Sequence, residues 1–210
     1  GGVDWLTLNR PERLNAFSPL MIDELWQYFA GLENTPGTRI VVVRGAGRAF
    51  CAGADLDDFL GSMAQGSEPD FQLQRQVSRV VVAMRRCPQP IIALIHGAAA
   101  EGGFSLALAA DIRIAGLSAR MNCAFIRIGL SGADMGTSYY LPRLVGPGNA
   151  AALMYTGRFI DALKAERIGL VNDAVADEEM LEVAQGYIQG MLATAPLALR
   201  LTKEALNAAI

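Results

Sequence analysis

"RIVVVRGAGRAFCAGADL", residues 39–56, joins an apolar run to a tight turn of small residues. The continuous β-branched run is typical of a buried strand. The turn at 51–55 lacks an obvious catalytic side chain, but its alanines and glycine let a ligand approach the main chain closely. A turn that ends a strand and opens a helix-like segment leaves N–H groups unpaired. We therefore predict that the backbone of this turn carries the chemistry.

A second stretch, "IIALIHGAAAEGGFSLALAADIRIAG" at 91–116, has the same order of apolar strand, glycine-containing turn and small-residue helix. Taken alone, either turn is more commonly a plain strand-to-helix connection. Two such turns that converge would aim N–H groups at one oxygen and favour negative charge on it. The pair together predicts an oxyanion hole.

Strands alternate with helices along the rest of the chain, which predicts the α/β class. A strand is expected at 3–8, a helix capped by Ser18 after it, and another helix at 72–86. We expect residues 1–150 to form the core that carries the site and 151–210 to form a C-terminal helical region. We also expect pieces to be missing at both ends, because the chain starts in a strand pattern and stops inside a helical one.

Composition narrows the classes of partner. A chain of 210 residues is long enough to bury a sizeable hydrophobic core. Its net charge of −3, with acidic and basic residues mixed along the chain, argues against nucleic-acid binding. Three widely spaced cysteines fit buried, reduced thiols and no metal constellation. Because no apolar run is long enough for a bilayer and no signal pattern opens the chain, we expect no membrane partner and a cytoplasmic protein.

Five motifs occur in an order and at a spacing that closely resemble the crotonase, or enoyl-CoA hydratase/isomerase, family. They cover nearly the whole chain and read "LNRPERLNAF", "GAGRAFCAGADL", "IHGAAAEGGFSLALAADIRIA", "IGLSGADMGTSYYLPRLVG" and "TGRFIDALKAERIGLVNDAV". The resemblance implies a crotonase-like spiral of ββα units, with stacked sheets and a C-terminal helical trimerisation region. It also implies a homotrimer or dimer of trimers, with acyl-CoA as substrate and no cofactor beyond the coenzyme A that the substrate carries.

The resemblance also implies roles for individual residues. Ala54 and Gly102 correspond to the residues whose N–H groups bind the thioester oxygen. Arg13 could meet a phosphate, although a solvated loop arginine is an equal alternative, and Asp55 could instead cap a helix. The predicted substrate-binding residues, along the pantetheine path and near the adenine, are Arg13, Leu14, Ala16, Ala52, Asp55 and Leu56.

The chain departs from the hydratases at their two catalytic glutamates. Ser105 and Phe125 stand at those positions, and phenylalanine cannot move a proton. One carboxylate remains nearby, Asp134 in "LSGADMGTSYY", and members with other chemistries carry a working aspartate at the corresponding place. We therefore expect Asp134 to be the general acid/base, or less plausibly a nucleophile; the structural alternative is a cap for the helix after Gly136.

Other polar residues have simpler interpretations. The only histidine, His96, is expected to be structural. Glu101 is expected to be a turn-surface glutamate, with an acid/base role as the alternative. Lys203 is expected to be an exposed helix lysine, although its family counterpart can reach a ligand in a neighbouring subunit.

These observations predict an acyl-CoA thioester-processing enzyme of enoyl-CoA hydratase/isomerase type that stabilises a thioester enolate. Two alternatives stay open. One is a catalytically degenerate acyl-CoA binding protein that lacks both hydratase glutamates. The other is a member that acts on a cyclic diketone without coenzyme A.

Overall fold

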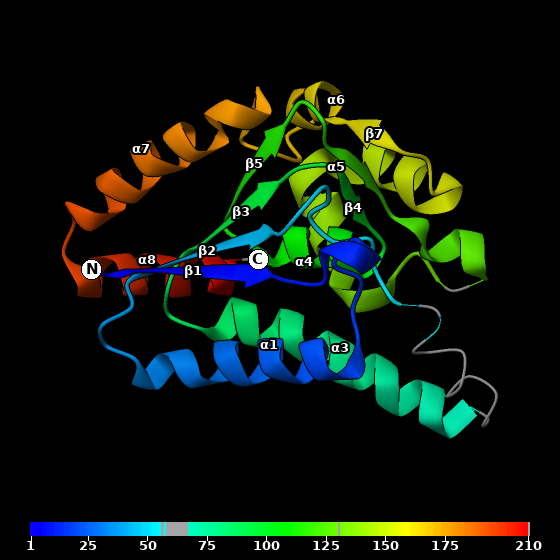
Figure 1. Cartoon of the computed structure of the whole chain (residues 1–210), viewed down its shortest axis with the longest axis horizontal. Helices are drawn as coiled ribbons and strands as arrows, with labels where there is room; N and C mark the ends of the chain where they lie inside the picture. Colours follow the sequence, from blue (N-terminus) through cyan, green and yellow to red (C-terminus); the bar gives the residue numbers. More distant parts are fainter. Residues whose placement is uncertain (56, 58–66, 130, 210) are drawn as a thin grey trace.

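A computed structural model describes residues 1–55, 57, 67–129 and 131–209, and Figure 1 shows its course from the N-terminus to the C-terminus. The helices and strands alternate as the sequence predicts, and the predicted α/β class is confirmed. The predicted substrate-binding residue Leu56 lies outside the described residues.

The main sheet explains why the apolar run of residues 39–45 is continuous. Its strands are all parallel, in the order β1 (Val3–Leu8), β2 (Ile40–Gly45), β3 (Ile91–Ile95), β5 (Ile112–Gly116) and β8 (Asp173–Val175). Val41 and Val43 point into one hydrophobic cluster, and Ile40 and Val42 point into another on the opposite face. Because both faces are covered, all four side chains are buried.

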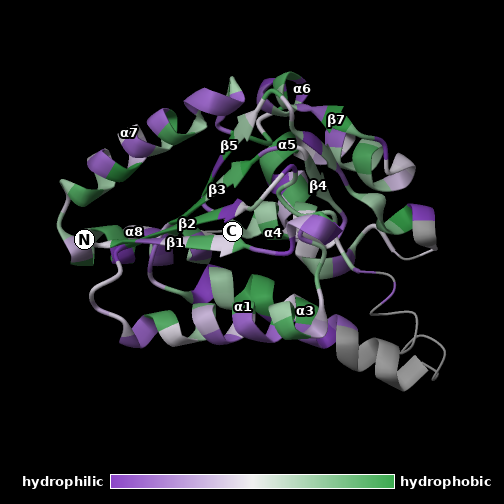
Figure 2. Cartoon of the chain, viewed as in Figure 1, coloured by the Kyte–Doolittle hydropathy of each residue, from purple (hydrophilic) through white to green (hydrophobic). Residues whose placement is uncertain are grey.

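Helices cover the two faces of this sheet. α1 (Pro19–Gly31) and α3 (Ser67–Arg86) lie side by side on one face, and α7 (Met180–Leu192) lies on the other (Figure 1). Figure 2 shows that the apolar sides of these helices face the apolar strands. Ser18 caps α1 as predicted, because its Oγ accepts the Met21 N–H at 3.2 Å. α3 begins at Ser67, ahead of the predicted start at residue 72.

A second, smaller sheet was not predicted from residue patterns. It contains β4 (Ala98–Ala100), β6 (Arg120–Asn122) and β7 (Ile160–Asp161). Strands of two or three residues are too short for a periodic pattern, and three alanines carry no strand signal. β4 forms most of the second predicted turn, so this sheet fixes that turn relative to the first.

The remaining helices follow the predicted order. α4 (Gly102–Ala109) is wholly buried, and α5 (Thr137–Thr156), α6 (Ala162–Arg167) and α8 (Pro196–Ala209) complete the chain. Single 3₁₀ turns lie at Pro11–Arg13, Leu32–Asn34, Ala124–Ile128, Asp134–Gly136 and Asp177–Glu179. The predicted boundary at residue 150 lies within α5, and the division into two regions stays a prediction.

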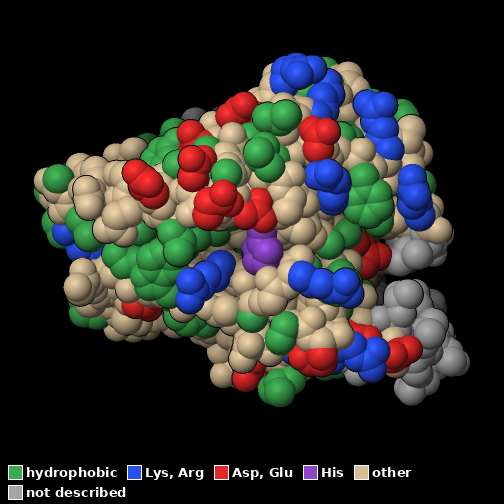
Figure 3. Space-filling view, turned by 45° about the horizontal axis from the view of Figure 1, so that its top comes forward, with side chains coloured by type: hydrophobic (Ala, Val, Ile, Leu, Met, Phe, Trp, Pro, Cys, Tyr) green, Lys and Arg blue, Asp and Glu red, His purple; other side chains and the backbone are tan. Residues whose placement is uncertain are grey.

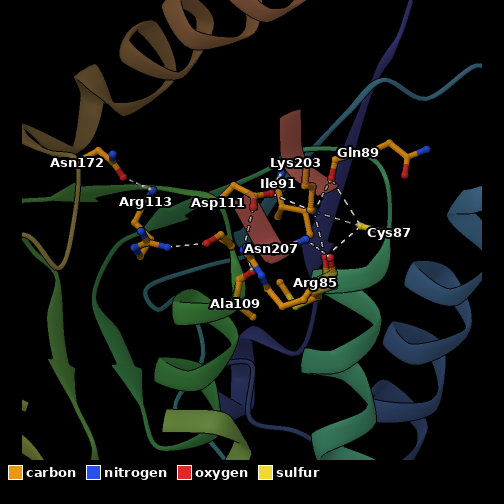
Figure 4. A network of polar contacts seen from close by, with 12 residues as sticks. Arg85, Cys87, Gln89, Ile91, Ala109, Asp111, Arg113, Asn172, Lys203 and Asn207 are labelled. Carbon is orange, nitrogen blue, oxygen red and sulfur yellow. Dashed lines mark hydrogen bonds and ion pairs between the residues drawn. The ribbon is translucent and has the colours of Figure 1, made fainter. Parts of the chain in front are cut away.

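Lys203 of α8 is only 4% exposed, so the expected exposed lysine is wrong. Figure 4 shows it inside a polar network, where its Nζ donates to the backbone oxygens of Met84 at 3.0 Å and Gln89 at 2.7 Å. The same Nζ lies 3.0 Å from Asp111 Oδ2, and Arg85 pairs with Asp111 Oδ1 at 2.8 Å. The network therefore fastens α8 to the end of α3 and to the start of β3.

On the face drawn in Figure 3, acidic side chains gather toward the upper left and basic side chains toward the upper right, with apolar side chains among both groups. None of the helices in the described part of the chain is long and apolar enough to cross a bilayer.

Candidate active site

The two predicted turns lie side by side. Cys51 N–H donates to Ala98 O, and Ala100 N–H donates back to Cys51 O, both at 3.0 Å. A Cβ at Gly103 would lie 2.1 Å from Cys51 O, so only glycine permits this approach of the two backbones. Small residues in both turns are therefore a packing requirement as well as a means of exposing the backbone.

A third segment, residues 14–17, runs along the first turn. Ala52 N–H donates to Leu14 O at 3.0 Å, Phe17 N–H to Gly53 O at 2.7 Å, and Asp55 N–H to Phe17 O at 3.0 Å. These bonds gather the predicted substrate-binding residues, which sequence spacing alone could not bring together. The described members of that set are Arg13, Leu14, Ala16, Ala52 and Asp55.

Asn15, which sequence reasoning missed, fixes this segment. Its buried Nδ2 donates to Ala46 O at 2.8 Å and Ala49 O at 2.7 Å, and its φ of 56° lies in the left-handed region. Asparagine tolerates that conformation better than most residues. That tolerance is a local signal that could have marked the position.

The charged residues at this edge are mutually paired. Asp55 is 6% exposed, and its Oδ2 lies 3.0 Å from Arg10 Nη2. The half-exposed Arg13 binds Asp57 Oδ2 through Nη1 at 2.8 Å. A phosphate that reached Arg13 would have to share its guanidinium with Asp57, so the phosphate role of Arg13 stays a prediction.

Glu101 occupies the predicted oxyanion donor of the first turn. Its Oε2 accepts the Ala54 N–H at 2.9 Å, and the residue is 7% exposed. The expected turn-surface glutamate is therefore wrong. A Cβ at Gly53 would lie 2.6 Å from this oxygen, so glycine is required at residue 53 for the carboxylate to reach the amide.

The backbone of Glu101 is strained. Its φ of 51° and ψ of −118° lie far from the regions that side chains with a Cβ normally adopt. Such conformations cost of order 1–3 kcal/mol, and they concentrate at functional sites. The strain places the carboxylate immediately before Gly102, the second predicted donor.

Asp134 lies close to the same turn. A Cβ at Gly102 would come within 3.1 Å of the sulfur of Met135, the neighbour of Asp134. Asp134 Oδ1 accepts the Met135 N–H at 2.8 Å, and its Oδ2 accepts from Gln74 Nε2 at 3.3 Å. Gly136 is the N-cap of α5 without a side-chain cap bond, so the alternative of Asp134 as its cap is wrong.

A cavity of about 600 Å³ opens beside Asp134. Residues of α1 and α3 form most of its wall, including Trp26, Phe29 and Arg79. Of the three predicted catalytic residues, all of which are described, Asp134 alone lines it. Gly102 lies next to Phe17 and Met135, and Ala54 forms a bridge to Phe17.

Both carboxyls have a raised pKa. Burial raises the pKa of Glu101, the hydrogen bond from Ala54 lowers it, and the charge of Asp134 raises it again. Burial also raises the pKa of Asp134, against the lowering effect of the Met135 N–H. Raised carboxyl pKa values favour proton transfer near neutral pH.

The two hydratase positions lie in the core. Ser105 is fully buried, with its Oγ 2.8 Å from Thr137 Oγ1, and Phe125 is 3% exposed. Neither side chain carries a carboxylate, so neither can replace a hydratase glutamate.

The thiols have no visible chemical role. Cys51, Cys87 and Cys123 are buried and unpaired, as expected, and burial raises the pKa of Cys51 to about 12. Within residues 1–55, 57, 67–129 and 131–209, no group of three or more His, Cys, Asp or Glu side chains could hold a metal ion. His96 Nε2 bonds to Gly47 O at 2.8 Å, consistent with a structural histidine.

Comparison with known proteins identifies the family. The sequence profile of the enoyl-CoA hydratase/isomerase family matches residues 1–210. A protein named probable enoyl-CoA hydratase from Mycobacterium bovis is 38% identical over 205 residues, 96% of this chain and 72% of the relative. The 1,2-epoxyphenylacetyl-CoA isomerase of Escherichia coli is 36% identical over 99% of this chain and 79% of its own length.

A solved structure supports the same assignment. The enoyl-CoA hydratase of Bacillus anthracis superposes with a TM-score of 0.91 at 34% identity, covering 98% of this chain and 78% of the other. The expected crotonase-like fold is therefore confirmed. The chain belongs to the enoyl-CoA hydratase/isomerase family and is a hydratase/isomerase-like enzyme.

Proposed function

We propose that this enzyme acts on acyl-CoA thioesters by stabilising an enolate. The N–H groups of Ala54 and Gly102 would bind the thioester oxygen, and Asp134 would move the proton. The reaction that fits best is relocation of a double bond, because neither hydratase glutamate is present to activate water. One of the similar proteins is named an isomerase of an acyl-CoA compound.

One observation carries the proposal. The Ala54 N–H already binds a buried oxygen that bears negative charge when Glu101 is ionised, 2.9 Å away. This contact supports the view that the amide points toward a place where an anionic oxygen can sit. Gly102 follows Glu101 directly and opens α4, where N–H groups have no partner inside the helix.

The chemistry follows from this placement. Asp134 would take a proton from the carbon beside the carbonyl, and the C–H electron pair would pass to the thioester oxygen as an enolate. The protonated Asp134 would then return the proton to the same or a conjugated carbon. Each backbone donor of this kind contributes about 3–4 kcal/mol to lowering such a barrier.

The binding path of coenzyme A is part of the same proposal. Segment 14–17 and the first turn are joined by hydrogen bonds, so the pantetheine would lie along the edge formed by Leu14 and Ala52, with Arg13 toward the phosphates. We also propose a homotrimer or dimer of trimers, as the family resemblance implies.

Exchange of the α-protons of a bound thioester with deuterated solvent tests the role of Asp134. We expect wild type to exchange and Asp134→Asn to exchange about 10²- to 10⁴-fold more slowly, because the general base is lost. Asp23→Asn, the same chemical change on the exposed face of α1, should exchange at the wild-type rate.

Two other outcomes would change the assignment. Retained exchange in Asp134→Asn would remove this residue from its role. Binding without exchange in wild type would favour the alternative, a degenerate acyl-CoA binding protein, which is supported by the serine and phenylalanine at the two hydratase positions, Ser105 and Phe125.

A further inference from the structure

The Ala54 amide cannot bind a thioester while Glu101 holds it. Glu101 Oε2 lies 2.9 Å from Ala54 N, which is the distance that a bound carbonyl oxygen would take. We propose that Glu101 is an internal competitor for the oxyanion donor, and that the thioester carbonyl must displace its carboxylate to bind. This inference rests on the proposed function, because it names Ala54 as a substrate contact.

The contact is built into the fold. Glu101 is buried between the two turns, and its position depends on glycine at residue 53 and on a strained backbone at residue 101 itself. A surface side chain that met an amide by chance would require neither feature.

Within the described part of the chain, neither Glu101 nor Asp134 forms an ion pair with a basic side chain. The described ion pairs at this edge join Asp55 to Arg10 and Arg13, and Asp57 to Arg13. Glu101 instead has a backbone N–H and, electrostatically, the carboxyl of Asp134. A ligand oxygen that accepts the Ala54 N–H would therefore replace the Glu101 carboxylate, whose negative charge is balanced, among the described residues, only by that N–H group.

The expected consequence lies in binding and not in the chemical step. The Glu101 carboxylate must leave the Ala54 amide before the substrate binds. Its removal therefore changes the free energies of the bound ground state and of the transition state by the same amount. Such uniform changes appear in KM and leave kcat unaltered. A catalytic role for Glu101 would instead lower kcat.

Glu101→Gln tests this with little change in shape, because glutamine keeps an acceptor oxygen but loses the charge. A hydrogen bond to a charged acceptor is stronger than one to a neutral acceptor, so we expect calorimetry to show that butyryl-CoA binds the variant roughly fivefold more tightly, which corresponds to about 1 kcal/mol. S-butyl-CoA, a thioether without the carbonyl oxygen, should bind wild type and variant equally. Glu182→Gln on the exposed side of α7 is the matched control and should change neither affinity.

Steady-state and spectroscopic readouts complete the test. For a thioester that wild type turns over, Glu101→Gln should lower KM without altering kcat, and the Ala54 amide resonance should shift between wild type and variant. Equal butyryl-CoA affinity in both proteins, a fall in kcat, or an unmoved Ala54 resonance would overturn the inference. If no coenzyme A compound binds either protein, the proposed function fails and this inference fails with it, whereas equal binding of butyryl-CoA overturns this inference alone.

Discussion

Two groups of charged side chains, each with one buried member, show how differently this chain treats charge. In the first, Lys203 and Arg85 surround Asp111, and further donors reach backbone oxygens, so each charge has an opposite partner (Figure 4). In the second, Glu101 and Asp134 are both acidic, and their described partners are backbone N–H groups and an amide.

The difference separates a structural network from a candidate site. Opposite charges with satisfied hydrogen bonds hold elements together, because breaking one contact leaves another charge buried and unpaired. In the candidate site, burial raises the pKa of both carboxyls, and the charge of Asp134 raises the pKa of Glu101 further, so among the described residues neither carboxyl has a charged partner that holds it ionised. Three predictions sharpen this contrast.

The largest effect is expected at the structural network. Lys203→Met should lower the free energy of unfolding by about 3 kcal/mol, because Asp111 and two carbonyl oxygens lose a buried partner. Urea unfolding measures this loss. Arg200→Met on the same helix is the control: its half-exposed side chain lies 3.6 Å from Glu33, and we expect a change below about 1 kcal/mol. Equal losses in the two variants would refute a structural role for the network.

A smaller effect is expected from the strained backbone of the site. Glu101→Gly should be more stable than Glu101→Ala by about 1–2 kcal/mol, because glycine adopts a φ of 51° and a ψ of −118° without strain. This difference already includes the opposing cost of glycine's greater conformational freedom in the unfolded chain. Both variants lose the carboxylate, so their comparison isolates the backbone. Ala100→Gly, one residue earlier in β4, should show the opposite sign and destabilise the protein. An alanine variant as stable as the glycine variant would contradict the strain.

The smallest effect concerns pH. The pKa of Glu101 is raised above its ordinary 4.5, so the folded protein binds this proton more tightly than the unfolded chain. The stabilisation is present below the unfolded pKa and is lost as pH rises through the folded pKa. The unfolding free energy of wild type should therefore fall relative to that of Glu101→Gln across this window, and the difference should level off above it.

Urea unfolding of both proteins at several pH values measures this prediction. Asp134 has a raised pKa as well, but it is present in both proteins and cancels in the difference. A wild type that gains stability relative to the variant as pH rises would show that the Ala54 hydrogen bond outweighs burial.

Local patterns predicted the parts of the fold that depend on local chemistry. The strand at Ile40–Gly45 follows from side-chain periodicity, and the cap at Ser18 follows from side-chain chemistry. The closeness of the two turns follows from the family resemblance, because neither turn alone specifies its neighbour. β4 and β6 were missed because strands of three residues have no periodicity to detect. Their pairing depends on segments distant in sequence.

The two charged residues that were misjudged show the same limit. A glutamate in a glycine turn and a lysine on a terminal helix are usually exposed. Lys203 is buried by contacts that include Met84, 119 residues earlier in the chain. Glu101 is buried by contacts that include the Ala54 amide, 47 residues earlier. Sequence spacing carries no signal for either contact.

The most direct test of the account is the carbonyl stretching frequency of a bound thioester labelled with ¹³C at the carbonyl. Two N–H donors aimed at its oxygen would polarise the bond, and we expect the band to move to lower frequency on binding to wild type, as in any hydrogen-bonded carbonyl. A band at the frequency of the free thioester would contradict the claim that Ala54 and Gly102 hold that oxygen.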